Sequence, residues 1–142
     1  NVTSLLRTEE TGKMASKTSK YAAVRTKLVA LQRGLAKKTD VIMDGRDIGT
    51  TVLPDAFAKI YLTASSDARA KRRYDELKEK GENRSFDAIK EDIKKRDYED
   101  MHRAISPLKQ ADDAVLVDTS DMNIEQVVAV LSKIIDEKKA GR

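Results

Sequence analysis

The sequence contains no cysteine and no tryptophan, and it has one histidine, four tyrosines and two phenylalanines. Without cysteine the chain can form neither a disulfide nor a thiolate metal site. The single histidine, His102, excludes a histidine-rich metal cluster, and we expect it on the surface or packed against a helix. The few aromatic side chains also argue against binding of single-stranded nucleic acid, which depends on bases stacking on aromatic rings.

Long apolar runs are absent as well. No run approaches the roughly 18 residues of a membrane-spanning helix, and the N-terminal residues lack the apolar core of a secretory signal. We therefore expect a cytoplasmic protein with no membrane partner.

The chain is rich in charged residues. Charged residues make up 37% of the 142 positions, and 28 basic against 24 acidic residues leave a net charge of +4. This length is usual for one domain. So mild a positive charge suits phosphate-bearing small molecules and nucleic acid alike, and it does not decide between them.

The order of apolar patterns predicts an α/β fold with a mainly parallel sheet flanked by helices in three layers. Short apolar runs rich in β-branched residues predict strands at 41–43, 58–62 and 114–117. Helical spacing and capping residues predict helices at about 13–38, 66–80, 85–104 and 123–138. Because ligands bind beyond the carboxyl ends of strands in such sheets, we expect the chemistry near residues 44–47.

The segment Asp44-Gly45-Arg46-Asp47-Ile48-Gly49-Thr50 is the densest candidate motif. A carboxylate at a strand end can hold Mg²⁺ directly or through water, and arginine binds phosphate with two parallel hydrogen bonds. An alternative interpretation is a turn with a surface ion pair. The segment is not a phosphate loop, because that motif needs a lysine after its second glycine, and the 142 residues do not contain it.

Two further groups of arginines are candidates for anion binding. Arg96, Asp100 and Arg103 are spaced to share one helical face, where the alternative is an intrahelical ladder of salt bridges. The second group consists of Arg69, Arg72 and Arg73, with Arg84 in the following loop. Its pattern suits a mobile flap that closes on phosphates, and the alternative is a solvated basic face.

In sequence order these motifs resemble the cytidylate kinase family over nearly the whole chain. The segments that carry the resemblance are Leu6-Arg7-Thr8-Glu9-Glu10, Ala15-Ser16, Val24-Arg25, Gln32-Arg33, the motif at 44–50, Val52-Leu53-Pro54-Asp55-Ala56, residues 59–65, Arg69 to Arg73, Arg96 to Arg103, Ser106-Pro107-Leu108 and Asp118-Thr119-Ser120.

The resemblance implies a P-loop nucleoside-monophosphate kinase that transfers the γ-phosphoryl group of ATP to CMP or dCMP. Residues 1–38 would be the remainder of the insert that binds the monophosphate, with its helix. Residues 39–142 would be the core kinase domain, with a lid around 66–90. Relative to the family, the N-terminal strand and the phosphate loop are missing. We therefore expect an inactive C-terminal fragment of a longer enzyme, whose remaining strands expose an edge or face.

The resemblance also implies a role for each candidate residue. Ser16, Arg25 and Asp47 would recognise cytosine, whose N3 and O2 atoms accept hydrogen bonds and whose amine donates them. The residues expected to hold the pentose and the α-phosphate are Arg96, Asp100 and Arg103, joined by Arg46. The residues expected to contribute to catalysis are Asp44, Arg46, Arg72 and Arg73.

The lid arginines would be Arg69, Arg72 and Arg73, placed where charge on the transferring phosphoryl group is neutralised. No direct metal ligand is expected, and Mg²⁺ would arrive with ATP near Asp44. The expected partners are CMP, dCMP and ATP, without nucleic acid, and the complete enzyme would be a monomer. The alternatives are a basic α/β module that binds nucleic acid without catalysis and a kinase of the same fold that uses UMP or AMP.

Overall fold

A computed structural model describes residues 2–3, 6 and 8–141. Arg7, part of the first segment that carries the family resemblance, lies outside the described residues. The elements in chain order are α1 (Glu9–Thr18), α2 (Ala22–Ala36), the π-helical turn η2 (Ile48–Val52), β1 (Ile60–Thr63), α3 (Ser66–Glu79), α4 (Phe86–His102), β2 (Val115–Asp118) and α5 (Ile124–Ala140).

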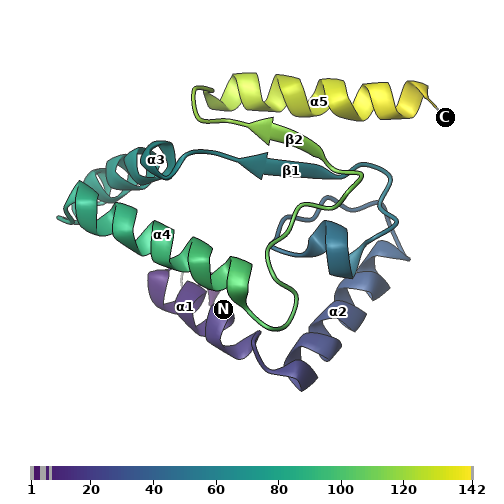
Figure 1. The fold of residues 1–142 in the computed structure, drawn as a ribbon, viewed down its shortest axis with the longest axis horizontal. Helices are drawn as coiled ribbons and strands as arrows, with labels where there is room; N and C mark the ends of the chain where they lie inside the picture. Colours follow the sequence, from purple (N-terminus) through teal and green to yellow (C-terminus); the bar gives the residue numbers. More distant parts are fainter. Residues whose placement is uncertain (1, 4–5, 7, 142) are drawn as a thin grey trace.

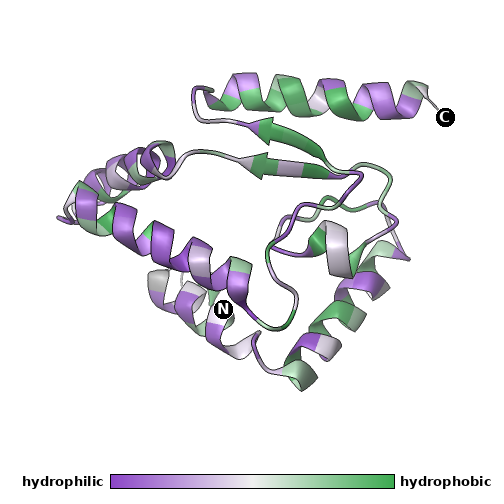
Figure 2. Cartoon of the chain, in the orientation of Figure 1, coloured by the Kyte–Doolittle hydropathy of each residue, from purple (hydrophilic) through white to green (hydrophobic). Residues whose placement is uncertain are grey.

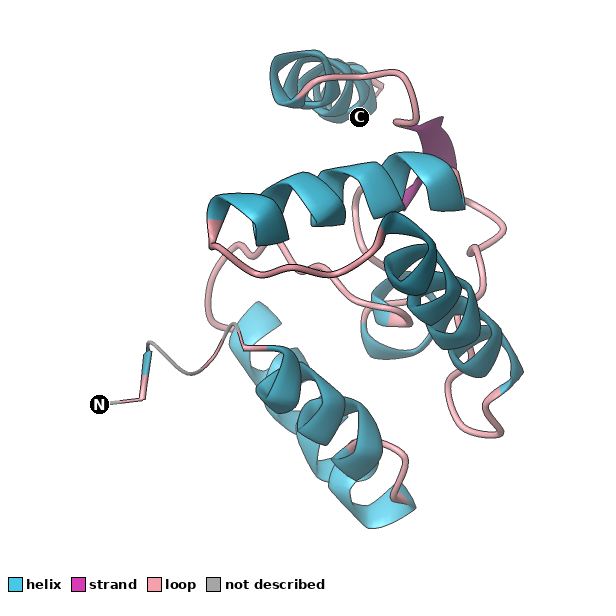
Figure 3. Cartoon of the chain, turned by 90° about the vertical axis from the view of Figure 1, so that its left-hand side faces the viewer, coloured by secondary structure: helices cyan, strands magenta, loops and turns pink. Residues whose placement is uncertain are grey.

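The sheet consists of β1 and β2, which pair in parallel with Ile60 opposite Val115 and Thr63 opposite Asp118. Two of the predicted strands and their parallel pairing are therefore confirmed, with shifts of one or two residues. Helix α5 lies along one side of the strands, and α4, α1 and α2 lie on the other (Figures 1 and 3). Helices on both sides of a small parallel sheet make this an α/β fold.

The predicted strand at Val41–Met43 is wrong, because these residues form a loop and Ile42 is 99% exposed. A strand is stabilised by hydrogen bonds to a neighbouring strand, and among the described residues only β1 and β2 pair with each other. An apolar run with no strand beside it therefore stays irregular. The loop continues through Asp44 to Asp47, which directly precedes the turn η2.

The predicted single helix over residues 13–38 is also wrong, because it is divided into α1 and α2 (Figure 1). The hydroxyl of Thr18 donates to the Met14 and Ala15 carbonyls, and the hydroxyl of Ser19 donates to the Ser16 carbonyl. Such side-chain bonds compete with the helical backbone. Tyr21, extended at φ −77° and ψ 125°, then begins α2 in a new direction.

Helices α3 and α4 form a hairpin around a small core of Ala70, Leu77 and Ile89. The hydroxyls of Ser65 and Ser85 cap the two helices by accepting from backbone N–H groups, and Gly81 follows α3 with a φ of +76°. The predicted ends of both helices are confirmed to within about two residues.

The last helix, α5, opens with the predicted capping box, in which Asn123 and Gln126 satisfy each other's backbone N–H groups. Green apolar residues cluster on the strands and along part of α5 (Figure 2). Leu62 and Leu116 nevertheless remain more than half exposed. In the part of the chain that the structure describes, each strand pairs with a neighbour on one side only. None of the described helices has both the length and the apolar character to cross a membrane.

Candidate functional site

Helix α2 and the loop before η2 meet through a buried ion pair. Arg25 extends from α2 and donates to the carboxylate of Asp47, which is only 4% exposed. Burying a charge is costly unless it is paired and hydrogen-bonded, so this pair joins two segments that are 22 residues apart. Two of the residues expected to recognise a base therefore lie in direct contact.

A second carboxylate, Asp100 near the end of α4, lies among three arginines and is 7% exposed. It accepts a hydrogen bond of 2.8 Å from Nε of Arg46. Nε of Arg96 and Nη1 of Arg103 each lie 4.0 Å from one of its oxygens. The structure thus brings together Arg96, Asp100 and Arg103 with Arg46 of the 44–50 motif, the group that the sequence predicts.

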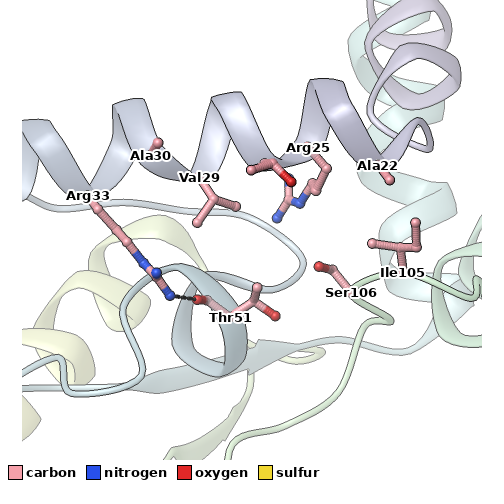
Figure 4. A pocket seen from close by; sticks show the side chains of 9 residues that line it. Ala22, Arg25, Val29, Ala30, Arg33, Thr51, Ile105 and Ser106 are labelled. Atoms are coloured by element: carbon pink, nitrogen blue, oxygen red, sulfur yellow. Dashed lines mark hydrogen bonds between the residues drawn. The ribbon is translucent and has the colours of Figure 1, made fainter.

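The loop after α4 folds back toward α2 because Arg103 ends the helix in an extended conformation with ψ 142°. Nε of Arg103 donates to the Ser106 carbonyl, and the Leu108 N–H donates to the Asp100 carbonyl at 2.7 Å. Ser106 has a φ of +51°, which is uncommon for a residue other than glycine and is further disfavoured before Pro107. This strained conformation places Ser106 opposite α2 (Figure 4).

We call Arg25, Arg46, Arg96 and Arg103 the arginine cluster. Burial, and secondarily the positive charge of Arg103, lower the pKa of Arg25. Four arginines against the two carboxylates Asp47 and Asp100 leave an excess of two positive charges. Within the described residues, Nε of Arg25 and Nη2 of Arg103 are buried and have no hydrogen-bond partner. A buried donor without a partner is costly, so these atoms and the excess charge favour an anionic ligand.

A cavity of about 430 Å³ opens beside the arginine cluster, between α2, η2 and the 103–108 loop (Figure 4). This volume lies within the range of small-molecule sites, which combine apolar walls with a few polar groups. The lining residues are Ala22, Arg25, Thr26, Val29, Ala30, Arg33, Thr51, Ile105 and Ser106. The cavity therefore offers an apolar slot with charged groups on its edge.

Ser16 and Asp44, like the three predicted lid arginines, are not joined to the arginine cluster by the contacts that the structure describes. Ser16 is half-buried on α1, and its carbonyl accepts a hydrogen bond from Ser19. Asp44 is exposed in the loop before Arg46. No group of three or more His, Cys, Asp or Glu residues suited to a metal ion occurs among the described residues.

The predicted lid arginines on α3 are bound to other parts of the chain. Arg69 forms two parallel hydrogen bonds with Asp97 at 2.9 and 2.7 Å, and its Nε donates to the Ala64 carbonyl. Arg72 donates to the Thr119 carbonyl and hydroxyl and to the Met122 carbonyl. Arg69 thus links α3 to α4, and Arg72 links α3 to the loop between β2 and α5.

The third lid arginine, Arg73, donates to Glu76 one turn later on α3 at 2.8 Å. Glu76 also accepts from Lys80 at 2.5 Å. The hydrogen bond from Lys80, followed by that from Arg73, lowers the pKa of Glu76 from 4.5 to about 2. Arg73 is therefore part of a partly exposed ion-pair row on the helix surface.

Arg33 makes a contact with η2 that the sequence did not predict. It lies two turns after Arg25 on α2, and its guanidinium donates to the Val52 and Thr51 carbonyls at 2.8 and 2.7 Å. Two features of the sequence could have indicated this contact. Arg33 belongs to the Gln32-Arg33 segment, and its spacing of eight from Arg25 keeps both arginines near one side of the helix.

The fold and this site define an α/β protein whose arginine cluster is suited to a phosphate group. The family model for cytidylate kinase matches residues 1–137. The chain therefore belongs to the cytidylate kinase family.

Curated relatives agree with this assignment. A cytidylate kinase of Lactobacillus johnsonii is 52% identical over 134 residues, which cover 94% of this chain and 58% of the relative. One from Thermosipho melanesiensis is 48% identical, covering 94% of this chain and 61% of the relative. One from Clostridium botulinum is 53% identical over 120 residues, covering 82% and 55%. The chain thus spans somewhat more than half the length of the curated relatives that it matches.

Proposed function

We propose that the whole protein transfers the γ-phosphoryl group of ATP to CMP or dCMP, and that this chain carries the site for the acceptor nucleotide. The bond between the γ-phosphorus and the bridging oxygen of ATP breaks, and a bond forms to an α-phosphate oxygen of CMP, which yields ADP and CDP. The observation that carries this proposal is the buried Arg25–Asp47 pair, which is part of an arginine cluster whose four arginines exceed its two carboxylates by two charges.

In this proposal the base is recognised by Asp47, Arg25 and Ser16. The cytosine amine donates to the Asp47 carboxylate, and Arg25 turns its unpartnered Nε and its terminal nitrogens toward N3 and O2. The apolar cavity wall, which includes Val29 and Ile105, takes the face of the ring. Uracil presents a carbonyl oxygen where cytosine has its amine, so it leaves the carboxylate facing another acceptor.

The α-phosphate is bound by Arg46, Arg96 and Arg103, and Asp100 holds these arginines in place and accepts from the sugar hydroxyls. A phosphate dianion matches the excess charge of the arginine cluster and pairs with the unpartnered Nη2 of Arg103. Positioning and charge stabilisation supply most of the catalysis in phosphoryl transfer. The chain's own contribution is therefore to hold the attacking oxygen in line.

The lid arginines act on the transferring group. Arg73 is half-buried and needs only to leave Glu76, whereas Arg72 must exchange the Thr119 and Met122 carbonyls for phosphoryl oxygens. When bound with ATP, Mg²⁺ would supply charge neutralisation at the phosphates. An exposed single carboxylate such as Asp44 fits an ion that keeps several waters of its own.

A thermal-shift and calorimetric panel tests the acceptor site on this chain. CMP and dCMP should stabilise the chain and bind more tightly than UMP or AMP, while single-stranded DNA should have little effect. The control is Arg103→Met, which removes a cluster arginine and should weaken CMP binding about tenfold or more. Stabilisation by DNA but not by CMP would instead favour the nucleic-acid module, and a preference for UMP or AMP would change the acceptor.

A further inference from the structure

Arg33 binds the end of the π-helical turn η2, which directly follows Asp47. Its Nε donates to the Val52 carbonyl at 2.8 Å, and its Nη2 donates to the Thr51 carbonyl at 2.7 Å (Figure 4 shows the second bond). The last carbonyls of a helical turn have no partner within the turn. A guanidinium fork that reaches two consecutive carbonyls binds them in one fixed geometry.

The turn transmits this contact to Asp47 through its own backbone. The N–H groups of Thr51 and Val52 both donate to the Asp47 carbonyl, at 2.8 and 3.2 Å, and the Leu53 N–H donates to the Ile48 carbonyl at 2.7 Å. Residues 47–53 are therefore one hydrogen-bonded unit. Holding its far end by Arg33 restricts the orientation of the Asp47 backbone at its near end.

Helix α2 thus contacts the turn at two places, with part of the cavity between them. Arg25 binds the Asp47 carboxylate at one end, and Arg33 binds the Thr51 and Val52 carbonyls at the other. Val29 lies one turn from each arginine and lines the cavity (Figure 4). Two contacts separated by two helical turns, about 12 Å along the axis, prevent the turn from pivoting about either one.

We propose that Arg33 is a positioning residue for base selectivity, which acts through the turn and without contacting the nucleotide. This inference rests on the proposed function, because it assumes that Asp47 reads the base. With the turn held at both ends, the Asp47 carboxylate sits at a fixed depth in the cavity. Without Arg33 the turn can pivot about the Arg25 pair, and a displacement of this kind at a recognition group costs about ten- to a hundredfold.

The test is the ratio of the CMP and UMP dissociation constants, measured by calorimetry on this chain. Arg33→Met keeps the aliphatic stem and removes both hydrogen bonds. It should reduce the preference for CMP about tenfold, chiefly by weakening CMP binding. Arg33→Lys, which cannot donate in parallel to both carbonyls, should give an intermediate ratio. The matched control is Lys27→Met, which removes an exposed cation from the same helix and should leave the ratio unchanged.

The outcomes separate the two proposals. A wild-type chain with no preference for CMP over UMP overturns the proposed function. A wild-type preference that Arg33→Met leaves unchanged overturns the inference alone, as does an equal loss of affinity for both nucleotides, which would indicate a purely structural role. If circular dichroism shows that Arg33→Met does not fold, the ratio for Arg33→Lys decides, and a wild-type ratio in that variant counts against the inference.

Discussion

At the scale of single residues, Asp47 is the side chain that would select most specifically for a hydrogen-bond donor on the ligand. Its side chain is nearly inaccessible to water, and Arg25 is its ion-pair partner. A carboxylate in such a position accepts hydrogen bonds and repels another acceptor. In the proposed function it therefore distinguishes an amine from a carbonyl at the same position of a pyrimidine.

Replacing Asp47 with Asn should lower kcat/KM for CMP in the whole protein by about 10- to 100-fold, because a charged acceptor is replaced by a neutral amide. Activity with UMP, which is poor from the start, should change much less. Steady-state kinetics with both nucleotides measures this, and Asp55→Asn, an exposed carboxylate after the turn, is the control. Equal losses for the two nucleotides would mean that Asp47 supports the loop and does not read the base.

At the scale of elements, α3 and its ending depend on local interactions that can be tested separately from the site. Gly81 has a φ of +76° just after the helix, a conformation that side chains with a Cβ rarely adopt. Gly34 lies inside α2, where a Cβ would meet nothing within 4 Å. The two glycines should therefore respond in opposite directions to the same substitution.

Gly81→Ala should lower the free energy of unfolding by about 1 kcal/mol, and Gly34→Ala should raise it by about 0.5 to 1 kcal/mol. Denaturant melts of the two variants beside the wild type provide the measurement. Stabilisation by Gly81→Ala would contradict the left-handed ending of α3.

Glu76 gives α3 a defined pH dependence. Its pKa is lowered to about 2 by hydrogen bonds from Lys80 and Arg73. A lowered folded-state pKa means that its stabilising effect is fully present above the unfolded value of 4.5 and is lost as the pH falls toward 2. Because the side chain is 46% exposed, solvent screening keeps the effect small.

We expect an NMR titration to give a Glu76 pKa well below 4.5. Lys80→Met removes the hydrogen bond that lowers the pKa of Glu76 most, so this variant should have a higher Glu76 pKa. The stability difference between the wild type and Glu76→Gln should be present at neutral pH and shrink between pH 4.5 and 2. A Glu76 pKa that Lys80→Met leaves in place would show that the ion-pair row does not persist in solution.

At the scale of the whole molecule, the chain contains the residues of the proposed acceptor site but no sequence motif for holding the phosphates of ATP. The arginine cluster and cavity are assembled from α2, η2, α4 and the loop after α4. No phosphate-loop motif occurs in the 142 residues. A phosphate loop holds the β- and γ-phosphates through its backbone N–H groups and lysine, so we expect this chain by itself not to hold ATP for transfer.

We predict that this chain by itself binds CMP but does not phosphorylate it. A coupled assay for ADP at saturating ATP and Mg²⁺, with the calorimetric panel as the control for an intact acceptor site, is the measurement. Turnover that co-purifies with the chain and is abolished by Arg103→Met would contradict the prediction. A chain that neither binds nor turns over CMP would count against the acceptor site itself.

The sequence by itself determined the local elements, because their signals lie within a few residues of one another. The capping residues Ser65, Ser85 and Asn123 bind backbone N–H groups three residues away, so α3, α4 and α5 were predictable. The spacing of Arg96, Asp100 and Arg103 likewise indicated one cluster. The motif at 44–50 indicated the family, which the family model then showed.

Only the tertiary structure decided where distant residues meet. The Arg25–Asp47 pair, the contact of Arg46 with Asp100 and the binding of Arg33 to η2 join residues 18 to 54 positions apart. The run at 41–43 has the composition of a strand but is a loop, because a strand requires a neighbour that composition does not specify. Hydrogen bonds within a turn can be inferred from neighbouring residues, whereas ion pairs and strand pairing depend on which distant segments the fold brings together.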